Sequence, residues 1–417
     1  MRRRRLHPKR VTASSVSVTK KSKSVTAAVG KPRARSPRRR PAQPERELLA
    51  RAKIRSSALG DAVDLTFGER ITVLVGRNGA GKSLLIEEID NLSLVTSPAH
   101  GRVDRRREPV EVEAKLDGVG ITFWHGHDGA GRTAGSSVSE SCKRDGQELW
   151  KVHKGTVTFG HTKPTMQLPP VAGLLWFAAF GPPVPPEAFR LRRLLEGITR
   201  IAAGPPRHNR PAIVTARRRK KLEPEERAPL PWVATAAPGA ERLADVVRWL
   251  LKFYEAESTL VKEVSEIGRR LKLWDRIERH LVTDADEEIA LVLVDGMMID
   301  RLSDGTLRVL EVLVHLVRPD CTVLLIEEPE NCIHPALQTR LMAELNSYSH
   351  KKQIVLSTHS FEIVSQCDAG AIRLVQRESD VTTVRPLSSI ELSNVRLFLQ
   401  EEGTLGDYVF SGALDDN

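Results

Sequence analysis

The chain has 417 residues, enough to bury a sizeable core in one large domain or two modest ones. Residues 1–46 hold 16 Lys and Arg against one acidic residue, whereas the other residues hold 48 against 52, so the net charge of +11 belongs to the N-terminal segment. The four cysteines include no CxxC pair and no apolar run is long enough to span a bilayer, which excludes a disulfide framework and a membrane-embedded protein and favours a cytoplasmic location.

The N-terminal segment, residues 1–46, is rich in Arg, Lys, Ser and Pro and nearly free of large apolar side chains. Such a composition cannot bury enough surface to offset chain entropy, so we expect a disordered basic tail. Folding is expected to begin near Arg51, and residues 47–417 are predicted to form one domain.

A glycine-rich motif, G-x-x-x-x-G-K-[ST], occupies residues 76–83 between an apolar, β-branched run at 71–75 and an apolar helical pattern. In such a P-loop the glycines allow backbone N–H groups to turn toward phosphates, Lys82 reaches the terminal phosphates, and the Ser83 hydroxyl binds Mg²⁺. The helix that follows directs its positive end at the same anion. The predicted nucleotide-binding residues here are Gly76, Arg77, Asn78, Gly79, Ala80, Gly81, Lys82, Ser83 and Leu84.

Beyond residue 97 the periodicity weakens. Strand-like stretches at 110–114, 120–124 and 155–159 are separated by glycine-rich segments. We interpret them as an antiparallel β segment.

The middle of the chain alternates between helical and loop-like patterns. A helix-like stretch at 187–201 is followed by residues 204–240, which are rich in Pro and basic residues and predict an exposed insert. Residues 241–281 then show an amphipathic helical pattern without a sustained heptad. We therefore place a helical insert or lid at about residues 181–285.

The last third of the chain is regular. A helix is predicted over 304–317, a buried strand at 323–326, a helix from Pro335, and a strand at 353–356. Strand–helix–strand alternation of this kind argues for a largely parallel sheet. The predicted fold class is therefore α/β, a P-loop NTPase with a mostly parallel sheet, an antiparallel β segment and a helical insert.

Two adjacent acids end the predicted strand at 323–326. The C-terminal ends of parallel strands are where ligands bind in open α/β sheets, and neighbouring strand residues face opposite sides. We therefore assign Glu327 to the Mg²⁺ shell and Glu328 to polarising the attacking water.

Two further polar clusters gain significance from their order in the chain. Ser303, Asp304 and Gly305 lie at a predicted helix N-terminus, which can bind an anion but is equally typical of an ordinary helix cap. His359 follows the predicted strand at 353–356, a place where a lone histidine is usually structural. Both fall in sequence around the double-glutamate strand, and this favours a role in the site.

This ordered set of motifs resembles the ABC-type ATPase heads of the SMC, RecF and OLD group. The matching segments are the P-loop, residues 302–306 (Leu-Ser-Asp-Gly-Thr), residues 325–335 (Leu-Ile-Glu-Glu-Pro-Glu-Asn-Cys-Ile-His-Pro) and residues 357–360 (Ser-Thr-His-Ser). The compact heads of bacterial anti-phage and overcoming-lysogenization-defect systems are the most similar. The resemblance covers roughly residues 50–375, and residues 403–407 (Gly-Thr-Leu-Gly-Asp) also have the character of that group.

The resemblance implies an AAA-family ATPase that uses ATP and Mg²⁺, with Lys82, Glu328 and His359 as catalytic residues. Glu328 would be the catalytic base and His359 the switch histidine. Residues 302–306 would be the signature motif, which binds the γ-phosphate of an ATP held by a second head. Two features depart from the group: a Glu, Glu327, replaces the usual metal-binding Asp, and no glutamine follows the P-loop helix at the expected place.

The function predicted on this basis is ATP hydrolysis by a head that forms a homodimer or higher oligomer around two ATP molecules and gates a partner in DNA repair or phage defence. Only 57 residues follow Ser360, too few for the TOPRIM nuclease domain of OLD nucleases, so we expect an effector such as a nuclease to be a separate protein. The basic tail and Arg217 to Lys221 would allow sequence-independent contact with DNA or RNA. Two alternatives stay open: a nucleotide-binding subunit of an ABC transporter, and an ATP-sensing, nucleic-acid-binding scaffold with little turnover.

Overall fold

The structure is a computed structural model in which every described residue belongs to one unit, Pro44–Asn417. The second unit, Met1–Gln43, lies outside the described residues, and the predicted tail therefore does so too, apart from Arg46. The described residues are 46–96, 109–128, 137–160, 162–169, 172–180, 184–206, 215–219, 232–235, 239–256, 259–283, 287–401 and 403–411.

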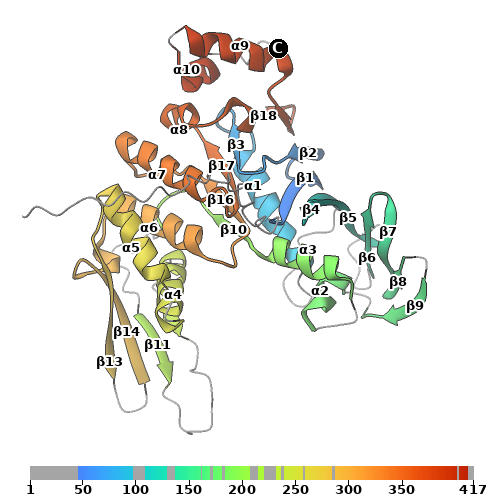
Figure 1. Cartoon of the computed structure of the whole chain (residues 1–417), viewed down its shortest axis with the longest axis horizontal. Coiled ribbons are helices and arrows are strands. Elements are labelled where there is room, and N and C mark those ends of the chain that lie inside the picture. Colours follow the sequence, from blue (N-terminus) through green and yellow to red (C-terminus); the bar gives the residue numbers. More distant parts are fainter. Residues whose placement is uncertain are drawn as a thin grey trace, which may run out of the picture. The chain divides into compact units, whose positions relative to one another are not determined.

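A six-stranded sheet in the order β10-β16-β17-β3-β18-β19 forms the centre of the fold (Figure 1). Neighbouring strands are parallel except for the β18–β19 hairpin, which confirms the predicted parallel sheet. Strands β3, β16 and β17 are buried along their whole length, as expected for apolar runs between two layers. The strands are β3 (Ile71–Val75), β10 (Ile198–Ile201), β16 (Val323–Glu327), β17 (Gln353–Thr358), β18 (Ile372–Glu378) and β19 (Val381–Pro386).

An eight-stranded antiparallel sheet in the order β2-β1-β4-β5-β6-β7-β8-β9 contains the three strands predicted in the weakly periodic region. Along β4, buried side chains alternate with more exposed ones, as expected for an antiparallel sheet with one face on a core. The strands of this sheet are β1 (Leu48–Arg55), β2 (Ala62–Thr66), β4 (Val110–Leu116), β5 (Val119–Asp128), β6 (Ser137–Arg144), β7 (Gln147–His153), β8 (Thr156–Phe159) and β9 (Thr162–Gln167).

The helices cover both faces of the central sheet. They are α1 (Lys82–Asp90), α2 (Leu174–Phe177), α3 (Pro186–Glu196), α4 (Glu241–Glu255), α5 (Leu260–Leu271), α6 (Asp304–Val317), α7 (Pro335–Tyr348), α8 (Phe361–Ser365), α9 (Ser389–Gln400) and α10 (Leu405–Phe410). Short 3₁₀ segments are η1 (Asn91–Thr96), η2 (Ala178–Phe180), η3 (Ile299–Arg301) and η4 (Ala369–Ala371). Within the described residues, none of these helices has the length and apolar character needed to cross a bilayer.

Two hydrophobic cores lie on opposite faces of the central sheet. Alternation along β16 sends Leu324 and Ile326 into one core and Val323 and Leu325 into the other. The first core, which we call the α6 core, is built with α4, α5, α6 and α7. The second, the α1 core, is built with α1, α2, α3 and the eight-stranded sheet. The P-loop helix and the predicted signature helix therefore pack in different cores.

The amphipathic region predicted as one helix over 241–281 is two helices and a strand. Helix α5 ends where Lys272 takes a left-handed conformation with φ 60°, and Trp274 packs back against Gly268. Strand β13 (Ile277–Thr283) then pairs with β14 (Glu287–Val294). The helical interpretation of residues 277–281 was wrong, because this stretch is held by strand pairing rather than by its own periodicity. The same sheet includes β11 (Thr215–Arg219), β12 (Val233–Thr235) and β15 (Met297–Met298).

The region expected to be an insert or lid, residues 181–285, differs in part from that expectation. Strand β10 lies inside it and yet pairs in parallel with β16 as an edge strand of the central sheet. Helices α4 and α5 are part of the α6 core. Strand β10 has the sequence Ile-Thr-Arg-Ile. With only two apolar residues, its pattern cannot be distinguished from the end of the preceding helix in the sequence.

The packing of Gly268 under Trp274 generates a stability prediction. A Cβ at Gly268 would lie 2.2 Å from Trp274 Nε1, and that indole is buried. We expect Gly268→Ala to destabilise the chain by about 2 kcal/mol, because overpacking exceeds the ~1 kcal/mol gained in helix propensity.

The measurement is the unfolding midpoint by circular dichroism, with Gly370→Ala as the control because nothing lies within 4 Å of a Cβ there. Equal midpoints for the two variants would contradict the prediction.

Candidate active site

The loop from β3 to α1 needs glycine at three positions. Gly79 and Gly81 have φ +81° and +96°, a left-handed region that favours glycine. A Cβ on Gly81 would lie 2.6 Å from Thr382 Oγ1, and one on Gly76 would lie 2.1 Å from the Val375 carbonyl oxygen. Gly76 and Gly81 are therefore also required by the packing of the loop against β18 and β19, whereas Gly79 is required by its backbone conformation alone.

Lys82 is buried at the first position of α1, and its ammonium group is held by the loop itself. Its Nζ donates to the carbonyls of Gly76 at 2.8 Å and Arg77 at 3.0 Å. Burial lowers the pKa of Lys82, while the negative charges of Glu328 and Glu330 oppose that shift. The lysine is thus kept within the loop, among backbone carbonyls that an incoming phosphate group could replace.

The two acids at the end of β16 have different environments, as strand alternation predicted. Glu327 is buried and its Oε1 accepts a hydrogen bond from Arg200 Nε at 2.6 Å. Glu328 is partly exposed, has φ +44°, and accepts from Asn331 Nδ2 at 2.7 Å. Its Oε1 lies 3.5 Å from His359 Nε2, so the structure brings together two of the three predicted catalytic residues.

Glu330 holds the segment that carries His359. Its Oε1 accepts from Thr358 Oγ1 at 2.8 Å and from the backbone N–H of His359 at 2.7 Å. No role was predicted for this residue, although it is the third acid of the Glu-Glu-Pro-Glu motif. It positions the histidine relative to Glu328 through the backbone rather than through the ring.

A cavity of about 1000 Å³ opens beside the P-loop. Arg77, Asn78 and Gly79 line it together with His359, and the far wall is formed by residues 374–380 of β18 and the turn after it. The end of α10 also contributes, through Val409 and Phe410. The described geometry therefore offers space next to the phosphate-binding loop and the predicted switch histidine.

The predicted signature residues lie elsewhere in the same chain. Ser303 caps α6, its Oγ accepting from the Thr306 N–H at 3.2 Å, and a Cβ on Gly305 would meet the Cys332 carbonyl oxygen at 2.3 Å. Ser303, Asp304 and Gly305 are not among the residues that line the cavity beside the P-loop. The N-terminal end of α6 therefore packs against the turn after β16 and does not line the cavity beside the P-loop of the same chain.

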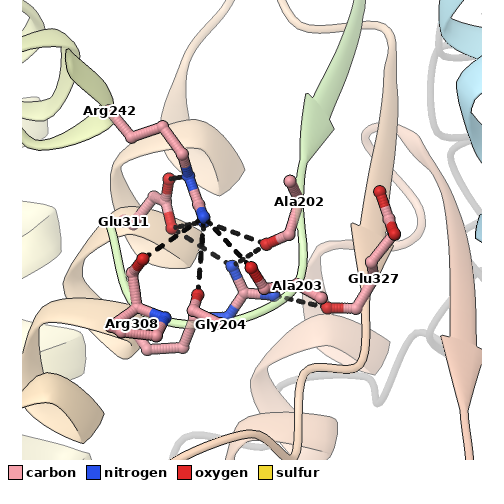
Figure 2. A network of polar contacts seen from close by, with 8 residues as sticks. Ala202, Ala203, Gly204, Arg242, Arg308, Glu311 and Glu327 are labelled. Carbon is pink, nitrogen blue, oxygen red and sulfur yellow. Dashed lines mark hydrogen bonds and ion pairs between the residues drawn. The ribbon is translucent and has the colours of Figure 1, made fainter. Parts of the chain in front are cut away.

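Helix α6 is connected to Glu327 by a buried polar network that Figure 2 shows from close by. Arg308, fully buried on α6, donates to the backbone carbonyl of Glu327 and to that of Ala202. Glu311, one turn further along α6, accepts from Arg308 Nη1 at 3.2 Å and from Arg242 Nε at 2.8 Å and Nη2 at 2.6 Å. Two arginines thus share one buried carboxylate.

Arg242 also fixes the segment that follows β10. Its guanidinium donates to four consecutive carbonyls, those of Ala202, Ala203, Gly204 and Pro205, at 3.0 to 3.5 Å (Figure 2). A planar group with five donors is suited to such a set, because it satisfies several backbone acceptors at once. The end of β10 is therefore tied to α4 and α6.

The residues near Glu327 are chemically suited to Mg²⁺, an ion that prefers oxygen ligands. Glu327 and Ser357 are directly paired in the β16–β17 register, so their side chains share one face of the sheet. Ser357 Oγ is buried and has no hydrogen-bond partner among the described residues. A buried hydroxyl without a partner beside a carboxylate fits an ion with its water shell, and Ser83 on α1 would supply the P-loop hydroxyl.

Sequence reasoning missed the arginines of the site. Arg308 stands in an otherwise apolar run of α6, and a charge at such a position with an acid three residues later was a usable signal. Arg200 and Arg242 gave none, because their partners are distant in sequence. The roles assigned to Lys82, Ser83, Glu327, Glu328 and His359 stay predictions, now with a defined geometry.

Part of the chain is similar to a known protein family. Residues 236–365 match the model of the family described as "AAA domain, putative AbiEii toxin, Type IV TA system". This stretch runs from α4 through α8 and contains Ser303, Glu328 and His359. No curated protein matches the chain.

Three solved structures are similar at 13% identity. The SMC head domain from Thermotoga maritima aligns with a TM-score of 0.42 over 82% of this chain and 100% of its own. An SmcHead bound to the C-winged helix domain of ScpA aligns with a TM-score of 0.41 over 83% and 99%. An Smc head domain with an extended coiled coil, bound to the C-terminal domain of ScpA derived from Pyrococcus furiosus, aligns with a TM-score of 0.41 over 85% and 99%.

A P-loop after β3, two acids at the end of β16 and a parallel α/β sheet define the class, that of P-loop nucleotide-binding proteins. The family match adds that residues 236–365 are similar to an AAA domain.

The buried network predicts that replacing the Glu311 carboxylate by an amide strongly lowers the stability of the fold. We expect Glu311→Gln to destabilise the chain by about 3–5 kcal/mol, because it leaves two buried or half-buried guanidinium groups without their carboxylate. The measurement is the shift of the unfolding midpoint.

Glu69→Gln is the control. The side chains of Glu69 and its partner Lys115 are both exposed, and such a surface pair contributes about 1 kcal/mol or less. If the two variants unfold at the same midpoint, the network does not stabilise the fold in the way described.

Proposed function

We propose that this chain hydrolyses ATP as a head that dimerises around two nucleotides and thereby gates a separate effector protein. The observation that carries the proposal is the placement of Glu328 Oε1 3.5 Å from His359 Nε2 at the end of β16, beside the P-loop cavity that His359 lines. A water molecule near the terminal phosphate would meet both side chains there.

The chemistry assigns one task to each residue. Lys82, freed from the carbonyls of Gly76 and Arg77, binds the β- and γ-phosphates. Glu328 takes a proton from the attacking water, the water oxygen bonds to the γ-phosphorus, and the bond from that phosphorus to the bridging oxygen breaks, giving ADP and phosphate. His359, which faces Glu328, orients this water or the γ-phosphate. Mg²⁺, held by Ser83 and Glu327, would neutralise phosphate charge.

Dimerisation is proposed because the predicted signature lies outside the cavity of its own P-loop. Ser303 and Gly305 at the start of α6 form an anion-binding helix end only if a phosphate is brought to them. A second copy, facing the first, would supply that phosphate and receive the same contact in return.

The role of the ATPase in the cell is proposed from the resemblance and the matched family. That family's description names a putative toxin of a toxin–antitoxin system, which supports defence ahead of DNA repair. Nucleic acid is included as a potential activator. Arg217 in β11 is exposed but lies 3.7 Å from Glu287 in β14, so its charge is partly compensated, and Lys220 and Lys221 lie outside the described residues.

Turnover tests the catalytic assignment. Glu328→Gln should lower the ATP hydrolysis rate by about 10²–10⁴-fold, because the base that accepts the water proton is lost while ATP binding is kept. The rate is measured by phosphate release with and without double-stranded DNA, and Lys82→Ala gives the background.

Each other result has a defined meaning. Equal rates for wild type and Glu328→Gln would contradict the assigned base. ATP binding without turnover above the Lys82→Ala background would instead favour the nucleotide-sensing scaffold, and stable association with a membrane permease would favour the transporter subunit.

Complementation tests the dimer. Lys82→Ala and Ser303→Arg should each abolish turnover, yet a mixture should recover up to about a quarter of the wild-type rate, since half the dimers are mixed and each has one intact site. Light scattering should show a dimer of Glu328→Gln with ATP. An inactive mixture together with a monomeric Glu328→Gln protein would contradict the nucleotide sandwich.

A further inference from the structure

The carboxylate predicted to bind the metal is already held by a cation of the chain itself. Arg200 Nε donates to Glu327 Oε1 at 2.6 Å, and the Glu327 side chain is only 4% exposed. No motif of the sequence assigned a role to Arg200. The contact occupies one of the two carboxylate oxygens that a divalent ion would need.

The sheet forces this pairing. In the β10–β16 register Arg200 stands opposite Leu325, so Glu327, two residues further along β16, shares its face. The backbone of Glu327 is held separately, by Arg308 of α6. The position of the carboxylate therefore does not depend on Arg200 alone, and the guanidinium can leave without releasing the strand.

A second carboxylate lies within reach of the same guanidinium. Glu87 Oε2 is 3.8 Å from Arg200 Nη1, and Glu87 lies on α1 one turn after Ser83, the P-loop residue assigned to the metal. Glu87 is 47% exposed, whereas Glu327 is buried. Arg200 thus stands between a buried acid in the site and an exposed acid at its rim.

Charge decides which partner the guanidinium prefers in each state. With no nucleotide, a buried carboxylate without a counter-ion is costly, so Arg200 remains on Glu327 and opposes a divalent cation there. A nucleoside triphosphate brings negative charge of its own, and this favours binding of the divalent cation at Glu327. Glu87 then offers the displaced guanidinium a solvated partner.

We propose that Arg200 is a positioning residue that occupies Glu327 in the nucleotide-free chain and shifts to Glu87 when the metal–nucleotide complex enters. Metal binding at Ser83 and Glu327 is thereby made conditional on the nucleotide. The inference rests on the proposed nucleotide site and deepens it, since it makes metal binding depend on the nucleotide.

The first arm of the test measures Mn²⁺ binding to the nucleotide-free full chain by electron paramagnetic resonance. Arg200→Ala should bind Mn²⁺ about tenfold more tightly than wild type, because a like charge next to the ligand is removed. Arg200→Lys, which keeps the charge, should bind as weakly as wild type. Arg270→Ala, which removes a surface arginine paired with Glu344, is the matched control and should not change the affinity.

The second arm measures binding of a fluorescent, non-hydrolysable ATP analogue with Mg²⁺ and with EDTA. Glu87→Gln should leave nucleotide-free Mn²⁺ binding as in wild type. It should also weaken binding of the analogue about fivefold with Mg²⁺ but not with EDTA, because the displaced guanidinium has lost its second partner. A purely structural ion pair would not produce this split.

Two results would overturn the inference. One is an unchanged or weaker Mn²⁺ affinity of folded Arg200→Ala, which would show that Arg200 does not compete with the metal. The other is an equal loss for Glu87→Gln with and without Mg²⁺. Failure of the wild-type chain to bind the analogue at all would instead count against the proposed function, while the Mn²⁺ measurement would still decide the role of Arg200.

Discussion

The shared carboxylate of Glu311 is the interaction on which the arrangement of the site depends. It binds two arginines from different helices, and these arginines in turn hold the chain at the ends of β10 and β16. Arg308 is fully buried, so it cannot exchange its partners for water. The edge strand and the acid-bearing strand are therefore fixed relative to α6 by charge, within an otherwise apolar core.

This arrangement explains how Glu327 can be buried and still have hydrogen-bond partners for both its backbone carbonyl and its carboxylate. Its backbone carbonyl accepts a hydrogen bond from Arg308, and its side chain accepts one from Arg200. Glu328, the next residue, leaves the strand with φ +44°, a conformation that costs about 1 kcal/mol or more for a residue other than glycine. A firmly held Glu327 gives the chain the support needed to keep that turn, which directs Glu328 toward His359.

The sequence predicted the parts of the fold that depend on local patterns. The buried strands predicted at 71–75 and 323–326, the P-loop and the start of α6 were all found, because glycine spacing and apolar runs are local signals. Strand β10 and strand β13 were missed, since short strands with few apolar residues are defined by their neighbours in the sheet. Arg200, the partner of Glu327, and Arg242, one of the two partners of Glu311, could not be found for the same reason: their contacts link residues far apart in the chain.

The division of the molecule into two cores has a consequence for inheritance. Helix α1, which carries Lys82, belongs to one core, and α6, which begins at the predicted signature, belongs to the other. A substitution of Ser303, which caps α6 and is exposed, would spare both cores. It would leave a subunit that still binds its own nucleotide and, in the proposed dimer, still joins a healthy partner. Such alleles would act dominantly by poisoning mixed assemblies, whereas alleles that unfold either core would fail to assemble and behave as recessive.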